Sequence, residues 1–325
     1  MNCTVCQSSD VVVVGAYRPY ADYRCDVFDC AACGSRFAEH DGSVYETLHS
    51  SAGSAYSLHD QLAQLCRETW DRGGADALKK LLTRMGSKLE FVIKTISARP
   101  EMRNLLEIGC SRGYLTSYFI AAGYNILGVD VSASAIEAAR SLFGGHFALA
   151  DAPEVESRQP YDAIFHVGTI GCVEAPEAFT RELLGRLRSG GVLAFNSPNV
   201  AVCHELGEIW VAGTSPPDLV TLFHEDYWRT HYDDAADVEV TVCPLDGVRS
   251  LQLAVTRARG RRQLGFPGAG MLEVEPPALD LRKTIGPVGR AIRAGIRGAL
   301  DAGQALKLVP RYSSDFGMYV VMTKK

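Results

Sequence analysis

The segment from Leu105 to Leu115 constrains the fold more than any other part of the chain, because its periodicity changes within a few residues. An apolar run passes through Glu107, and Gly109 and Gly113 follow four positions apart. A helical pattern begins directly afterwards. The change predicts a buried strand that turns into a helix, with glycines where the backbone approaches a ligand closely. We expect a nucleoside to bind at this turn, although many chains contain the same short pattern by chance.

Strands and helices alternate after this point, which is typical of a mostly parallel sheet. The expected strands are Asn104–Cys110, Tyr124–Val129, His146–Ala150, Tyr161–Val167, Gly191–Asn196, Asp237–Cys243 and Gly317–Met322. The expected helices are Tyr114–Ala122, Ala133–Leu142, Pro176–Arg188 and Leu219–His231. Ligands of such sheets bind beyond the carboxyl ends of the strands.

Acidic residues stand at two of these strand ends. Asp130 follows Gly113 by 17 residues, where a carboxylate can accept both hydroxyls of a ribose. It can also be a helix N-terminal cap, although Ser132 can take that role. Asp151 ends the next strand, where it can accept a hydrogen bond from an adenine amine or stabilise a turn. We favour the ligand-binding interpretation for both carboxylates.

Residues 104–199 resemble the class I S-adenosylmethionine-dependent methyltransferases. The resemblance is carried by five segments in the expected order, which read LLEIGCSRGYL, GVDVS, ALADA, YDAIFHVGTIGCVEAPEAF and LLGRLRSGGVLAFNSPN. It implies an α/β, Rossmann-like fold with a seven-stranded, mostly parallel sheet whose last strand is antiparallel. A dinucleotide oxidoreductase is disfavoured, because the G-x-G-x-x-G turn is absent.

The resemblance also implies a cofactor site for S-adenosylmethionine. Its residues in this sequence are Glu107, Gly109, Ser111, Gly113, Asp130, Val131, Asp151, Ala152, His166 and Val167. Asp130 is expected to hold the ribose and Val131 to pack on the adenine. Two departures stand out. Ser111 occupies the position of the usual middle glycine, and Gly171-Cys172 replaces the Glu-His pair of the fourth segment.

Methyl transfer is an in-line displacement, so the protein has to position the acceptor and, where needed, remove a proton. His166 is the first candidate base, because its strand ends near the expected cofactor site. Packing is the simpler role for that side chain. His224, in the segment His224-Glu225-Asp226-Tyr227-Trp228, is the second candidate. Residues 196–231 are expected to form a wall of the acceptor pocket.

Four cysteines near the N-terminus form two C-x-x-C pairs, Cys3 with Cys6 and Cys30 with Cys33. Four thiolates complete the tetrahedral set that structural Zn²⁺ prefers. The pattern predicts a small zinc-ribbon module over residues 1–46, whose closed metal site stabilises rather than catalyses. Four unrelated buried thiols are the alternative, and Cys25 is a possible substitute ligand.

The remaining organisation follows from composition and pattern. Residues 47–98 are expected to be a linker and a helical lead-in, and residues 99–325 the methyltransferase domain. The N-terminus has no basic and apolar regions of a signal peptide, and no run is long enough to span a bilayer. With 10 cysteines and no export signal, a reducing cytoplasm is the expected compartment.

Residues 257–314 are expected to insert a helix with a basic face between the last two strands. This helix can pack on the domain or on a partner in a homodimer, contact a phosphate-bearing or carrier-linked acceptor, or lie on a membrane surface.

Three functions remain to be compared. The leading one is methylation of a small-molecule acceptor: a natural product, a sugar or a carrier-linked intermediate. The second is RNA methylation with the zinc module on nucleic acid, which is disfavoured because residues 1–60 hold only three basic residues, Arg18, Arg24 and Arg36. The third is a non-catalytic regulator that binds the cofactor.

Overall fold

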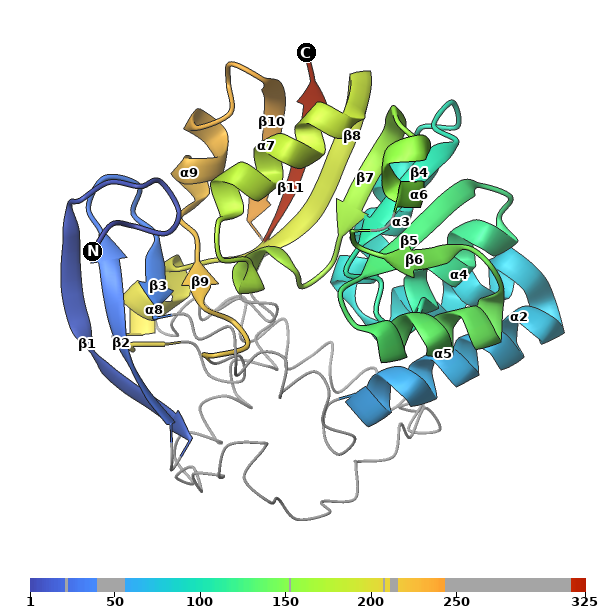
Figure 1. Ribbon diagram of the computed structural model, residues 1–325, viewed down its shortest axis with the longest axis horizontal. Coiled ribbons are helices and arrows are strands. Elements are labelled where there is room, and N and C mark those ends of the chain that lie inside the picture. The colour runs from blue at the N-terminus through green and yellow to red at the C-terminus, as the bar shows by residue number, and fades with distance from the viewer. Residues whose placement is uncertain (21–22, 40–55, 152, 207, 211–215, 243–316) are drawn as a thin grey trace, which may run out of the picture.

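A computed structural model describes residues 1–20, 23–39, 56–151, 153–206, 208–210, 216–242 and 317–325 of the 325-residue chain. Seven strands form one sheet in the order β10-β11-β8-β7-β4-β5-β6 (Figure 1). Their bounds are β4 Asn104–Ile108, β5 Asn125–Asp130, β6 Phe147–Leu149, β7 Tyr161–His166, β8 Leu187–Pro198, β10 Ala236–Val242 and β11 Gly317–Lys324. The five strands from β8 to β6 are parallel, and β11 runs antiparallel to both β8 and β10. The predicted fold class is therefore confirmed.

Apolar side chains leave both faces of the sheet, as expected of parallel strands covered on two sides. Successive residues of β4 divide between two cores, because Leu105 and Leu106 point to opposite faces. One core receives the helices α2 (Tyr56–Met85), α3 (Ser87–Ser97), α4 (Tyr114–Ala121) and α5 (Ala133–Phe143). The other receives α7 (Pro176–Arg186) and α9 (Glu225–Thr230). The short elements α6 (Pro153–Ser157), η1 (Ile170–Cys172) and α8 (Ala201–Leu206) complete the described helices.

The N-terminal residues do not form a separate unit. Strands β1 (Val11–Tyr20), β2 (Tyr23–Cys30) and β3 (Arg36–Ala38) make an antiparallel sheet that continues into β9 (Thr221–Leu222). Figure 1 shows this sheet beside α8 and α9, at the opposite end from α2. Cys3, Val5 and Phe37 also belong to the core between the large sheet and the helices α7 and α9. The module is thus built jointly by residues 1–39 and by the segment that follows β8.

Two expectations about helices differ from the structure. The helical lead-in expected within residues 47–98 is not continuous, because Gly86 separates α2 from α3. Residues 219–231 contain β9 before α9, so the predicted helix over this whole range is wrong. The pairing of Phe37 with Thr221 explains the second difference, because the backbone groups of Thr221 and Leu222 form the ladder with β3 in place of helical hydrogen bonds.

Several expectations concern residues outside the described part. They include the insertion at 257–314, Ala152 and most of the segment 47–57. Within the described ranges, none of the helices has the length and apolar character needed to cross a membrane.

Candidate functional site

The turn between β4 and α4 is held in an unusual backbone conformation. Gly109, Ser111 and Gly113 all have positive φ, of 71°, 50° and 75°. A Cβ at Gly113 would lie 2.5 Å from the Phe147 ring, and one at Gly109 would lie 2.6 Å from the Thr169 hydroxyl oxygen. Both glycines are therefore required by the fold. Ser111 adopts the same region despite its Cβ, at a cost of roughly 1–2 kcal/mol.

Asp130 ends β5 directly beside this turn. Its Oδ2 accepts a hydrogen bond from the Ser111 N–H at 2.9 Å, and its Oδ1 accepts one from the Ser132 N–H at 2.9 Å. A carboxylate oxygen has two acceptor positions, so each oxygen keeps one for a further donor. Two free positions on one carboxylate match the two hydroxyls of a ribose.

The capping alternative for Asp130 is settled by its neighbour. Ser132 is the N-cap of α5, and its hydroxyl accepts the Ala135 N–H at 3.3 Å. Asp130 instead orients the turn through backbone donors. A role of this carboxylate in binding a ligand stays a prediction.

Glu107 lies in β4 and is only 3% exposed. The Thr116 hydroxyl of α4 donates a hydrogen bond to its Oε2. Burial, together with the negative charge of Asp130, raises the pKa of Glu107 to about 8. The residue thus ties the end of β4 to α4, beneath the turn.

This pKa predicts how stability depends on pH. The folded protein holds the Glu107 proton more tightly than the unfolded chain, whose carboxyl keeps its ordinary pKa of 4.5. The ligand-free protein should therefore lose stability, by up to a few kcal/mol, as pH rises from about 4.5 to 8. We expect Glu107→Gln to flatten that part of a plot of melting temperature against pH. Glu137→Gln, on the exposed side of α5, is the control, and equal slopes in both variants would refute the assignment.

The other predicted cofactor residues surround the same strand ends. Val131 is 70% exposed, which is unusual for a large apolar side chain and suits a surface for an adenine ring. Asp151 is exposed in the turn after β6. Val167 follows β7 and packs on the core that includes α4. These placements agree with a cofactor site, and the individual roles stay predictions.

His166 is fully enclosed at the end of β7. Its ring stacks on Phe195 at a centroid distance of 4.6 Å and lies 5.8 Å from Phe179. Burial lowers its pKa to about 3, so the imidazole is neutral at physiological pH. Its Nδ1 has no hydrogen-bond partner among the described residues. This environment favours packing over proton abstraction.

His224 lies on the other side of the site. It is the N-cap of α9, where its Nδ1 accepts the Asp226 N–H at 3.3 Å. A Cβ at Gly34 would come within 3.1 Å of the His224 side chain, so this histidine packs against the second cysteine pair. The structure does not bring His166 and His224 together through any described contact, and a base role for either stays a prediction.

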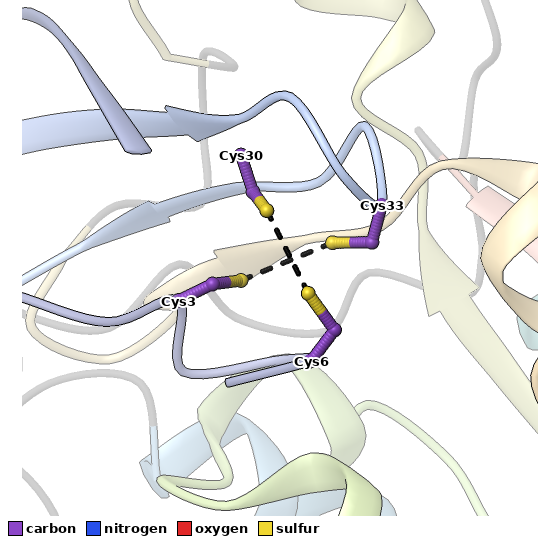
Figure 2. A group of neighbouring side chains, drawn as sticks. All are labelled: Cys3, Cys6, Cys30 and Cys33. Atoms are coloured by element: carbon purple, nitrogen blue, oxygen red, sulfur yellow. Dashed lines mark hydrogen bonds between the residues drawn. The ribbon is translucent and has the colours of Figure 1, made fainter. Parts of the chain in front are cut away.

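The four predicted cysteines do converge (Figure 2). All four sulfurs lie within 4.8 Å of one another. The Sγ atoms of Cys3 and Cys33 are 3.8 Å apart, and those of Cys6 and Cys30 are 3.6 Å apart. The contact with Cys3 lowers the pKa of Cys33, and the contact with Cys33 raises that of Cys3. Cys25 lies outside the cluster, with its Sγ 3.9 Å from the Tyr17 carbonyl oxygen.

Side chains connect the cysteine cluster to the segment after β8. Arg36 is buried, forms an ion pair with Asp29, and donates to the carbonyl oxygens of Glu208 and Ile209. The Tyr227 hydroxyl lies 2.9 Å from that of Tyr232 and 3.5 Å from the Val5 carbonyl oxygen.

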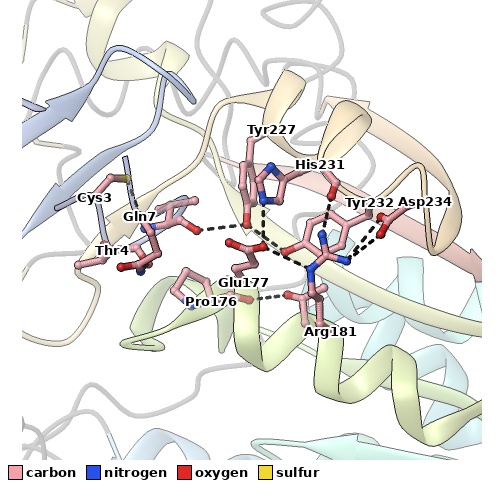
Figure 3. A network of polar contacts seen from close by, with 12 residues as sticks. Cys3, Thr4, Gln7, Pro176, Glu177, Arg181, Tyr227, His231, Tyr232 and Asp234 are labelled. Carbon is pink, nitrogen blue, oxygen red and sulfur yellow. Dashed lines mark hydrogen bonds and ion pairs between the residues drawn. The ribbon is translucent and has the colours of Figure 1, made fainter. Parts of the chain in front are cut away.

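Figure 3 shows the continuation of this network to α7. Glu177 pairs with His231 at 3.1 Å and with Arg181 at 3.3 Å, and Arg181 also reaches Asp234. The expected acceptor wall is therefore fixed between the cysteine cluster and the large sheet.

Two residues of the site were not predicted from the sequence. His59 and Asp60, near the start of α2, contact Ser111 and Arg112 of the glycine turn. They precede the turn by about 50 residues, and no motif marks them. Only the tertiary position of α2 reveals them.

Comparison with known proteins finds a family match over the central segment of the chain. A protein family described as "Methyltransferase domain" matches residues 106–193. A curated relative, malonyl-[acyl-carrier protein] O-methyltransferase of Acetivibrio thermocellus, is 29% identical over 127 residues, which cover 38% of this chain and 44% of that protein. The chain thus spans less than half the length of this relative.

Solved structures give matches over longer parts of the chain. An S-adenosylmethionine-dependent methyltransferase from Archaeoglobus fulgidus is 18% identical, covering 78% of this chain and 96% of that one, with a TM-score of 0.42. The plantazolicin methyltransferase BpumL, in complex with a substrate analogue and S-adenosylhomocysteine, is 14% identical, covering 82% of this chain and 98% of that one, with a TM-score of 0.40.

Proposed function

We propose that this chain, whose residues 106–193 are a class I methyltransferase domain, transfers the methyl group of S-adenosylmethionine to a small-molecule or carrier-linked acceptor. One observation carries the proposal. The Asp130 carboxylate stands at the strand end where the resemblance to the methyltransferases implies the ribose, with one acceptor position left on each oxygen. The exposed Val131 beside it offers an apolar surface to the base.

The chemistry asks mainly for positioning. When bound, S-adenosylmethionine supplies a methyl carbon already activated by a positively charged sulfur. Asp130 and the turn at residues 109–113 would orient the cofactor, and the described residues of the wall, 196–206, 208–210 and 216–231, would exclude water and direct the acceptor. His166 is neutral and enclosed, and His224 caps α9. We therefore propose that the acceptor binds with its nucleophilic atom already unprotonated, and that positioning contributes more to the rate than general-base catalysis.

The name of the curated relative and the aromatic residues of the wall support a proposal about the acceptor. The curated relative is named for a carrier-linked substrate, and a solved structure with the same fold is named for a natural product. In this chain, the wall contains Trp210, Tyr227 and Trp228, and Tyr232 directly follows it, all buried. We propose a carrier-linked or natural-product acceptor. Near the ends of β7 and β8, the Gly168 N–H donates a hydrogen bond to Asn196 Oδ1 at 2.8 Å, which places polar groups at this edge of the sheet.

RNA methylation is the second candidate, and the charge of the module argues against it. Of the three basic residues in segment 1–60, Arg36 is 5% exposed and paired with Asp29. Arg24 lies 3.7 Å from Asp26. A module that neutralises a phosphate backbone needs several accessible cations. This pattern leaves the module poorly suited to nucleic acid.

We also propose that the cysteine cluster binds one structural Zn²⁺. A tetrahedral site with Zn–S bonds of about 2.3 Å has S···S edges of about 3.8 Å. The distances of 3.8 Å and 3.6 Å across the cluster fit such edges and are far longer than a disulfide bond. The Val5 N–H, 3.3 Å from the Cys3 sulfur, supplies the kind of backbone donor that supports a thiolate ligand. Four protein ligands would leave no open position for catalysis.

The function is tested by turnover. The purified protein, with S-adenosylmethionine carrying a labelled methyl group, is offered two panels. The first holds small-molecule acceptors, which are natural products, sugars, and acyl chains on acyl-carrier protein or coenzyme A, and the second holds structured RNA. We expect label transfer to a member of the first panel and none to RNA. Transfer to RNA alone would replace the proposal by the second candidate. Tight binding of the cofactor with no transfer to either panel would favour a regulator.

A further inference from the structure

Ser111 departs from glycine at a position where its backbone is strained, and its hydroxyl has a specific contact. The Oγ atom lies 3.1 Å from Nδ1 of His59 in α2. The N–H of the same residue donates to Asp130 Oδ2 at 2.9 Å. A continuous chain of hydrogen bonds therefore runs from α2 through Ser111 to the carboxylate at the end of β5.

A second contact joins the next residue of each segment. Asp60 Oδ1 and Arg112 Nε form an ion pair at 2.6 Å, and Arg112 is only 9% exposed. The ring of His59 also lies edge-on to that of Tyr114, at a centroid distance of 5.7 Å. Two consecutive residues at the start of α2 thus contact two consecutive residues of the turn.

The position of α2 is set independently of these contacts. Further along the helix, Trp70 stacks on Phe143 of α5 at 6.1 Å, and Arg67 donates to the Leu142 carbonyl oxygen at 3.2 Å. Leu62 and Cys66, which precede the kink at Gly73-Gly74 as His59 does, are buried. His59 is therefore presented to the turn by a helix that is already anchored to the core.

We propose that His59 and Ser111 form a positioning pair for the ribose of the cofactor. The inference rests on the proposed function and adds two residues to it. His59 fixes the hydroxyl of Ser111, and this contact holds the backbone of the turn in place. The Ser111 N–H then donates to Asp130 Oδ2 and fills one of its two acceptor positions. The remaining positions of the carboxylate then face the two ribose hydroxyls. Ser111 replaces glycine because a glycine would leave the turn without this tie to α2.

The test is a double-mutant cycle read by calorimetric binding of S-adenosylhomocysteine to the full chain. We expect His59→Ala and Ser111→Ala each to weaken binding about fivefold, and the double variant to weaken it about fivefold as well. Arg72→Ala is the matched control, because Arg72 is exposed on α2 and pairs with Glu68 at 3.4 Å, away from the turn. Its affinity should equal that of the wild type.

Rescue separates positioning from a general structural role. His59→Asn places an amide nitrogen near the position of Nδ1 and should restore most of the affinity, whereas His59→Gln reaches the position of Nε2 and should not. The melting temperature of the ligand-free variants should change by less than about 2 °C.

Three results would overturn the proposed pair. They are a loss of affinity of about 25-fold in the double variant, unchanged affinity in both single variants, or equal rescue of affinity by His59→Asn and His59→Gln. Absence of binding in the wild type would instead overturn the proposed function, and the pair with it.

Discussion

Replacing Asp130 with alanine is expected to weaken binding of S-adenosylhomocysteine more than tenfold. The carboxylate would lose hydrogen bonds to two ribose hydroxyls, and hydrogen bonds to a charged group contribute about 1.5–3 kcal/mol each. The Ser111 and Ser132 N–H groups, which it accepts at 2.9 Å, would also lose their partner and let the turn relax. Isothermal titration calorimetry at neutral pH measures the effect.

Two variants make this result specific. Asp130→Asn keeps the shape of the side chain and one acceptor oxygen, so its affinity should fall between those of the wild type and Asp130→Ala. Glu137→Ala removes an exposed carboxylate from the adjoining helix α5 and should bind like the wild type. If Asp130→Ala bound as tightly as the wild type, the ribose assignment would be wrong.

Loss of the metal is expected to have the largest effect on stability. The wild type should contain about one zinc ion per chain by elemental analysis, and Cys30→Ser should lose most of it. Structural zinc sites contribute folding free energy directly. With a loss of a few kcal/mol, the melting temperature should fall by about 5 °C. Hydrogen exchange should accelerate in residues 221–232, because β9 pairs with β3 and the Tyr227 hydroxyl lies near the Val5 carbonyl oxygen.

The control for this prediction is another buried cysteine of the same sheet. Cys25 lies in β2, 3% exposed, but its sulfur stands outside the cluster. Cys25→Ala should therefore retain the zinc, and any loss of stability should come from packing alone. A metal-free wild type, prepared without chelators, would refute the zinc site and leave the cofactor site untouched.

The sequence predicted the central sheet well because its signals are local. Apolar strands, the glycine turn at residues 109–113 and the acidic residues after the strands are each encoded within a few positions. The sheet has seven strands with an antiparallel β11, as the resemblance to the methyltransferases implied. The convergence of Cys3, Cys6, Cys30 and Cys33 was likewise predictable, because a C-x-x-C pair brings its two sulfurs together through the turn that contains them.

Prediction failed where partners distant in the chain decide the conformation. Thr221 and Leu222 have a helical context in the sequence, yet they are drawn into a strand by Arg36 and Phe37. The pairing of β3 with β9 was not predicted, because nothing local indicates that the last strand of the N-terminal sheet comes from a segment about 180 residues later. His166 is a titratable residue in the sequence, and its aromatic enclosure is visible only in three dimensions.

What the sequence determined by itself is therefore the class of fold, the glycine turn at residues 109–113 and the four cysteines that converge. Each of these depends on spacing along the chain. The tertiary structure alone decided which groups face one another: the fusion of the cysteine module with the wall after β8, the neutral state of His166, and the contact of His59 with Ser111. The physical reason is that burial and hydrogen bonding depend on neighbours in space, and periodicity records only neighbours in sequence.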